Sequence, residues 1–272
     1  MTCSTSTCSA SKGAHALRLS KNKPWRLARG ASALLLAMTG LVTSASPTAA
    51  APNRQGPTAK DQAKCPASLA DQLRRTGTAR QLVTVVGPRM ATVSATVELW
   101  QRTGSCWTKA GGPWPALIGR NGFSDHHREG DGTTPTGMYA IGPTVYGNAP
   151  NPGTKLRYER LTCGDWWDED PTSRQYNTFQ HLPCGQAPPF GGNSEALWTE
   201  TTAYPSLIVI EYNMHPVVPY AGSAIFVHAN IGAPTQGCVT LPLGELDTLL
   251  RWLRPSASPH IVMGPAGEVT RF

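Results

Sequence analysis

Residues 225–242 read IFVHANIGAPTQGCVTLP, an apolar run rich in β-branched residues, then a return containing Gly and Pro, then a cysteine. Alternation in the run predicts a strand with its odd-numbered residues on one face and Phe226 and His228 on the other. The loop NIGAPTQG would then bring Cys238 back beside His228. The stretch therefore places a thiol and an imidazole at one end of a sheet.

Four roles are open to Cys238: a nucleophile, half of a disulfide, a metal ligand or a buried apolar side chain. A thiol becomes an effective nucleophile when a neighbouring imidazole stabilises its thiolate, and His228 is placed to do so. Gly237 lets the backbone approach a substrate closely, and converging N–H groups there would bind an oxyanion. The residues alone leave the competing interpretation open, in which Cys238 is disulfide-bonded and His228 is a structural histidine.

The first 51 residues are predicted to be a signal peptide that is cleaved near Ala50 or Ala51. Six Lys and Arg residues precede an apolar run at 31–42, and small residues follow it. That run is shorter than the roughly 20 residues of a membrane-spanning helix. We therefore expect an exported protein with no stable membrane insertion after cleavage. Residues 52–64 are polar and are predicted to be a flexible spacer.

Removing the predicted signal peptide also changes the charge of the chain. The full sequence carries a net charge of +7, and the loss of the six leader cations lowers it to +1. A basic protein suggests nucleic acid or an acidic surface as a partner, but this excess leaves with the leader. We therefore expect no nucleic-acid partner. The remaining chain is long enough for one large domain.

Five cysteines follow residue 51, an odd number for a compartment in which thiols tend to pair. The cysteine left without an intramolecular partner there either forms an intermolecular disulfide or is a free thiol kept for its reactivity. If Cys238 is the free one, the other four allow three pairings. Their order in the chain alone suggests Cys65–Cys106 and Cys163–Cys184.

The rest of the chain predicts a mainly β fold with long loops rich in Pro and Gly. Residues 65–112 form a small N-terminal region, either separate or part of the same domain, with a helix at 66–76 and strands at 81–87 and 91–101. Further short strands are expected at 106–109, 114–118, 137–141, 207–212, 224–229 and 260–264. A C-terminal helix is predicted to bury one stripe against the sheet, formed by Leu243, Leu246, Leu250 and Leu253.

Residues 143–200 have little periodicity and concentrate aromatic, acidic, Pro and Gly residues. A loop this long is usually functional or disordered, and its aromatics and cysteines favour an ordered lid over a cleft. Within it, the carboxylates of CGDWWDEDP at 163–171 would hold an amine-bearing acceptor, and Trp166 or Trp167 would pack on glycan or peptide. A solvated acidic loop with core tryptophans fits this segment equally well.

A second polar segment, SDHHREGD at 124–131, contains adjacent histidines. They would suggest metal binding, but neighbours on a strand point in opposite directions and no second cluster has ligand spacing. A polar loop that lines the cleft or lies on the surface is the better interpretation, and no metal site is predicted.

The segment from His228 to Cys238, with Thr235, Gln236 and Gly237 before the cysteine, resembles the signature of the L,D-transpeptidase catalytic domain family (YkuD-type). DGTTPTGMYAIG at 131–142 and GSAIFVH at 222–228 are similar to that family's segments ahead of the site. The resemblance covers residues 113–264. It implies an L,D-transpeptidase-like β-sandwich catalytic domain over 113–272, with the C-terminal helix packed on it.

The resemblance also implies a reaction on bacterial peptidoglycan, and hence a protein that is secreted or held in the cell wall. Cys238 would attack a stem peptide at an L,D bond and form a thioester, with His228 as the base and the Ala229 carbonyl orienting its ring. The N–H groups of Gly237 and Cys238 would form the oxyanion hole. The amine of a second stem would then resolve the thioester and give a cross-link, so stem peptides are both donor and acceptor.

Several further expectations follow from the same resemblance. Family membership implies inactivation by carbapenem-type β-lactams, no metal or organic cofactor, and here a monomer. Water as the acceptor would make the enzyme an L,D-carboxypeptidase, and a wall-binding module without turnover is the alternative from another class. A papain-like or NlpC-type peptidase is disfavoured, because there the Cys normally precedes the His.

The sequence departs from the family pattern around the motif. Nine residues separate His228 from Cys238, fewer than in many members, and Gln236 stands where many carry a second His. Thr240 occupies a position often held by Asn or Arg. These departures put substrate recognition in doubt more than the chemistry, and the predicted substrate-binding residues are Thr235, Gln236, Thr240, Asn230, Trp166 and Trp167.

Overall fold

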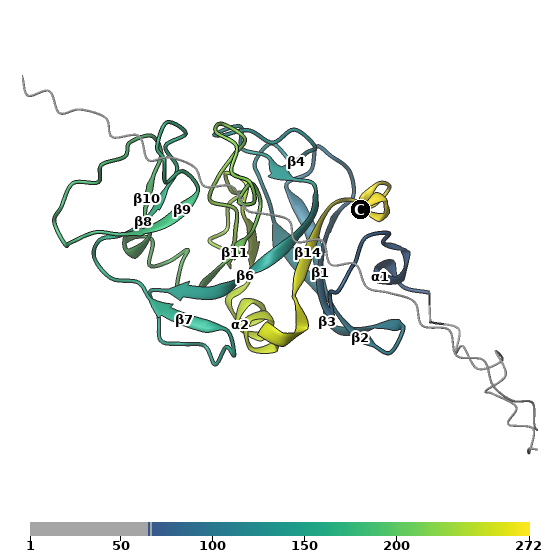
Figure 1. Ribbon diagram of the computed structural model, residues 1–272. Helices are drawn as coiled ribbons and strands as arrows, with labels where there is room; N and C mark the ends of the chain where they lie inside the picture. The colour runs from purple at the N-terminus through teal and green to yellow at the C-terminus, as the bar shows by residue number, and fades with distance from the viewer. Residues whose placement is uncertain (1–64, 66) are drawn as a thin grey trace, which may run out of the picture. The chain divides into compact units, whose positions relative to one another are not determined.

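The computed structural model describes residue 65 and residues 67–272, and strands dominate them (Figure 1). The predicted signal peptide and spacer lie outside the described residues. The strands are β1 Gln81–Gly87, β2 Ser94–Thr103, β3 Cys106–Leu117, β4 Phe123–Ser124, β5 Thr134–Pro135, β6 Gly137–Gly147, β7 Arg157–Arg160, β8 Asp165–Asp168, β9 Thr178–His181, β10 Glu195–Ala196, β11 Leu207–Ile210, β12 Phe226–Ala229, β13 Val239–Leu241 and β14 His260–Pro265. The helices are α1 Leu69–Gln72, α2 Leu243–Trp252 and three 3₁₀ turns, η1 Leu197–Thr199, η2 Pro255–Ala257 and η3 Val269–Arg271. The predicted mainly β fold with a C-terminal helix is confirmed.

One large sheet forms the body of the protein, in the order β11-β12-β13-β3-β2-β1-β14-β6-β7. The long strand β6 pairs with β14 through residues 137–140 and with β11 through residues 141–146, so the sheet closes on itself. The two layers of this β-sandwich enclose the largest apolar cluster, to which strands from both ends of the chain contribute. Alternation along β12 is as predicted, because Ile225, Val227 and Ala229 face this cluster and Phe226 faces the opposite side.

The N-terminal strands belong to the same sheet. β1 pairs with β2 and, in parallel, with the late strand β14. The division suggested by the sequence at residues 112 and 113 falls inside β3, which runs unbroken where two short strands were expected at 106–109 and 114–118. Register shifts opposite β2 let the ladder continue past Gly111 and Gly112.

The predicted helix at 66–76 is wrong in its length, since α1 spans only Leu69–Gln72. Leu73 is already extended, and the N–H of Arg74 donates to the carbonyl of Phe272 at 2.7 Å instead of continuing the helix. Within α1 the Asp71 carboxylate accepts from the N–H of Trp107 at 3.1 Å. A tertiary contact with the chain end therefore replaces further turns of helix.

The C-terminal helix α2 packs on β12 and β13, but its buried stripe differs from the prediction. Leu246, Leu250 and Leu253 are buried as expected, and Leu249 joins them. Leu243 was expected in this stripe but is 50% exposed, at the first position of the helix.

Between β7 and β11 of the large sheet, residues 161–206 form an insertion with its own three-stranded sheet, β10-β8-β9. Both predicted disulfides are present, Cys65–Cys106 and, within the insertion, Cys163–Cys184. Trp167 anchors the insertion to the large sheet, because its ring packs edge-on against Phe226 of β12 at 5.0 Å. Its Nε1–H donates to the Asn177 side chain at 3.0 Å. The insertion is thus fixed beside the strand that carries His228.

Candidate active site

Cys238 lies directly before β13, and His228 lies in β12. These two strands are parallel neighbours, with Val227 opposite Val239 and His228 opposite Thr240. Cys238 is 8% exposed and is the one free cysteine of residues 65 and 67–272. The short return loop therefore brings the thiol and the imidazole onto adjacent strands.

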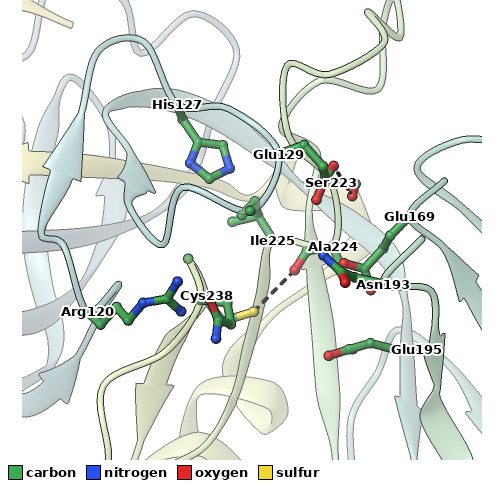
Figure 2. A pocket seen from close by; sticks show the side chains of 13 residues that line it. Arg120, His127, Glu129, Glu169, Asn193, Glu195, Ser223, Ala224, Ile225 and Cys238 are labelled. Atoms are coloured by element: carbon green, nitrogen blue, oxygen red, sulfur yellow. Dashed lines mark hydrogen bonds between the residues drawn. The ribbon is translucent and has the colours of Figure 1, made fainter. Parts of the chain in front are cut away.

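The sulfur and the imidazole are each hydrogen-bonded to backbone groups in this structure. The thiol donates to the carbonyl oxygen of Ala224 at 3.2 Å (Figure 2), and the Phe226 N–H donates to the sulfur at 3.4 Å. The Nδ1 of His228 lies 3.0 Å from the carbonyl oxygen of Ala229. Among the described residues no hydrogen bond joins the imidazole to the sulfur.

Burial keeps both groups neutral. It lowers the pKa of His228 to about 4, although hydrogen bonds to the carbonyls of Ala229 and Ala203 partly oppose the shift. It raises the pKa of the Cys238 thiol well above its usual range, and the charge of Glu195 adds to the rise. The resting pair is therefore a thiol with a neutral imidazole that can accept a proton at neutral pH.

Two threonines hold the backbone just before the cysteine. Thr134 of β5 donates to the Gly237 carbonyl at 2.7 Å, and Thr235 donates to the Cys238 carbonyl at 2.6 Å. The Gly237 N–H in turn donates to the Thr235 hydroxyl at 3.1 Å. Of the two N–H groups expected to bind an oxyanion, that of Gly237 is occupied in this structure, which leaves that of Cys238.

A cavity of about 390 Å³ opens beside Cys238. Arg120 lies on one side of it and the carboxylates of Glu129, Glu169 and Glu195 on the other, with the sulfur between them (Figure 2). Gln236 and Gly237 complete the wall next to the cysteine. The insertion supplies Glu169 and Glu195, so it borders the cavity as the sequence suggested.

The polar segment at 124–131 lines this cavity through His127 and Glu129, which agrees with its interpretation as a loop at the cleft. The His127 side chain is buried, with Nδ1 3.0 Å from the Thr133 hydroxyl and 3.0 Å from a carboxylate oxygen of Asp131. Burial lowers its pKa, and the nearby carboxylates only partly oppose this. Its neighbour His126 is exposed. Within the described part of the chain, no group of three His, Cys, Asp or Glu side chains is placed to hold a metal.

The predicted substrate-binding residues near Cys238 occupy different environments. Gln236 is exposed and lines the cavity. Thr235 is turned to the backbone of residues 237 and 238, and Asn230 accepts from the Gly232 N–H at 2.7 Å. Thr240 is fully buried, and its hydroxyl donates to the Leu117 carbonyl at 3.3 Å. Only Gln236 of these four is in contact with the cavity.

Neither tryptophan of the predicted set lines this cavity. Trp167 is 2% exposed and packs into the cluster under the insertion. Trp166 is half-buried, edge-on to Phe190 and Trp198. Both side chains therefore have their main contacts within the insertion and its base.

The sequence did not predict that the three glutamates of the cavity would lie close together. Glu129 comes from the loop before β5, Glu169 follows β8 and Glu195 begins β10. Glu195 accepts from the Tyr204 hydroxyl at 2.8 Å, and the Tyr204 ring lies edge-on to His228 at 5.1 Å. The acidic composition of CGDWWDEDP was the available signal, but it covers only Glu169.

Glu169→Gln should stabilise the protein more at pH 8 than at pH 5. Burial, then the charges of Glu195 and Glu129, raise the pKa of Glu169 well above the 4.5 of the free group. Above pH 4.5 the unfolded chain therefore releases a proton that the folded chain keeps, and stability is lost as the pH rises towards the folded pKa. Denaturation at pH 8 should show a gain of about 1–3 kcal/mol, the cost of an unpaired buried polar group.

Glu245→Gln on α2 is the matched control, with an expected change of about 0.5 kcal/mol or less. An equal gain for Glu169→Gln at pH 5 and pH 8 would show that the carboxyl is not protonated in the folded state.

No helix among the described residues is long and apolar enough to cross a membrane. Comparison with protein families gives a match to the model of the L,D-transpeptidase catalytic domain over residues 94–262, more than half of the chain. No curated protein and no solved structure matches the sequence or the fold.

Proposed function

The chain belongs to the L,D-transpeptidase catalytic domain family, and on that basis we propose that it is an exported acyltransferase of the peptidoglycan cell wall with a cysteine nucleophile. The observation that supports this most directly is the free Cys238 at the wall of a cavity, one strand away from a neutral His228. The donor and the acceptor are both stem peptides.

In the first step the sulfur forms a bond to the carbonyl carbon at the L,D bond of the donor. The Cys238 side chain turns from Ala224 towards His228, and the thiol proton passes to the imidazole. Because Nδ1 already donates to Ala229, the other ring nitrogen accepts this proton. The N–H of Cys238 stabilises the oxyanion. The C–N bond then breaks, and the released D-amino acid takes the proton from the imidazolium.

In the second step an amine of another stem attacks the thioester. Its nitrogen forms the new amide bond and gives a proton to His228, the C–S bond breaks, and the thiolate recovers that proton. Water in place of the amine gives a trimmed peptide by the same sequence of bonds, which is L,D-carboxypeptidase activity.

Mass spectrometry of the purified protein with a disaccharide-tetrapeptide tests this proposal. We expect a covalent adduct on the protein and dimeric stems among the products. Trimmed monomers alone would identify a carboxypeptidase. No adduct and no altered peptide, under reducing and non-reducing conditions, would overturn the enzymatic proposal.

A wall-binding module without turnover differs in the state of its thiol. Titration of native and unfolded protein, compared with Cys238→Ala, should assign one thiol equivalent to Cys238. Because the thiol is buried with a raised pKa, we expect it to react slowly until the protein unfolds. An oxidised Cys238 in freshly purified protein would favour the module.

A further inference from the structure

Three carboxylates converge on the cavity from segments far apart in the sequence (Figure 2). Glu129 accepts from the hydroxyls of Tyr176 and Ser223, the latter at 2.7 Å. Glu195 accepts from the Tyr204 hydroxyl. Glu169 differs from both, because its Oε1 is buried and has no hydrogen-bond partner. A buried carboxylate oxygen without a partner beside an open cavity needs an explanation.

The three carboxyl groups also have no cationic partner among the described residues. No Lys or Arg in the described part of the chain forms an ion pair with Glu129, Glu169 or Glu195. Arg120, the one Lys or Arg that lines the cavity within that part, lies on the opposite side. The pKa values of Glu169 and Glu195 are raised, by burial first. A cation bound among clustered carboxyl groups favours their charged forms, so it would displace the proton that buried Glu169 keeps in its absence.

The arrangement suits an organic ammonium better than a metal ion. No three His, Cys, Asp or Glu side chains in residues 65 and 67–272 are close enough to share one ion. An ammonium on an alkyl chain has three N–H donors that point in different directions. It can therefore use the free oxygen of Glu169 and one neighbouring carboxylate at the same time.

The position of the three carboxyl groups beside the Cys238 thiol points to a role in the reaction. Glu129, Glu169 and Glu195 line the same cavity as Cys238, on the side of the sulfur opposite Arg120 (Figure 2). We propose that Glu129, Glu169 and Glu195 form a subsite for the primary ammonium of the acceptor, with Glu169 as its main ligand. The inference rests on the proposed function. It explains how the site would favour an amine over water.

Binding of a simple amine tests the subsite without any turnover. The probe is Nα-acetyl-L-lysine amide, and the matched control ligand is the same molecule with its side-chain amine acetylated. An NMR titration should show at least tenfold weaker binding of the acetylated probe, and at least tenfold weaker binding of the amine to Glu169→Gln. Glu169→Asp should recover part of the loss, whereas Glu245→Gln should bind as the wild type.

Equal binding of the two probes to the wild type, or of the amine to Glu169→Gln and the wild type, overturns the subsite. So does an absence of binding to the wild type. Because Glu169→Gln should raise stability, its loss of binding cannot come from unfolding, and a melting curve checks this.

A second measurement uses the thioester itself. With a tetrapeptide donor and the amine probe, the ratio of amide to hydrolysed product should fall at least tenfold in Glu169→Gln. Both products come from one thioester, so the ratio is independent of its rate of formation. An unchanged ratio overturns the subsite. A wild type that binds the amine but forms no thioester would retain the subsite and reject the proposed function.

Discussion

Cys238→Ala should lower product formation from a disaccharide-tetrapeptide by on the order of 10³-fold or more, the scale seen when a catalytic nucleophile is removed. The reason is chemical, since the described residues contain no second free thiol and alanine cannot form a thioester. The measurement is the rate of D-amino acid release. The adduct with a carbapenem-type β-lactam, followed by intact mass, should disappear as well.

Cys238→Ser separates nucleophilicity from packing, because the hydroxyl keeps nearly the same shape and the hydrogen bond to Ala224 but is a far weaker nucleophile. It should be nearly as inactive as the alanine variant while its melting temperature stays close to that of the wild type. Residual activity of Cys238→Ala within tenfold of the wild type would place the nucleophile elsewhere.

Trp167→Ala should lower the free energy of unfolding by about 3–5 kcal/mol, the range for removing a large buried aromatic side chain. The indole is 2% exposed, packs on Phe226, and donates to the Asn177 side chain, which would lose this partner. Urea denaturation at neutral pH is the measurement. Because the insertion carries Glu169 and Glu195, amine binding should weaken in the same variant.

Trp166→Ala is the matched comparison, one residue away on the other face of β8. Removing its half-buried ring should lower the free energy of unfolding by about 1–2 kcal/mol. If the two variants were equally stable, the insertion would not be anchored through Trp167.

The predictions of strands and helices were right where a segment has a strong periodic pattern of apolar residues. The alternation around His228 predicted both faces of β12, and the leucine spacing predicted α2. The extent of α1 was missed because its end is set by a hydrogen bond from Arg74 to the last residue of the chain, which no local pattern contains. The continuity of β3 was missed because Gly111 and Gly112 suggest a break, whereas the register shifts with β2 absorb them.

The residues of the candidate site were likewise predicted only where they are close together in the sequence. The motif around Cys238 could be recognised from neighbouring residues in the sequence. Glu129 and Glu195 could not, because about 65 residues separate them and nothing in the sequence reveals that two loops meet. Which way the sulfur points is also a property of packing, because the choice between Ala224 and His228 depends on the side-chain rotamer of Cys238.

The return between β12 and β13 has a consequence for protein engineering. Residues 231–234 are exposed, whereas Thr235 is held by the backbone of Ile118 and the positions of His228 and Cys238 are set by the ladders of their strands. Extra residues inserted at 231–234 would therefore lengthen an exposed tip that is close in the sequence to Gln236, which lines the cavity, and leave the reacting groups in place. This tip is the natural position for a length-randomised library in search of new acyl donors.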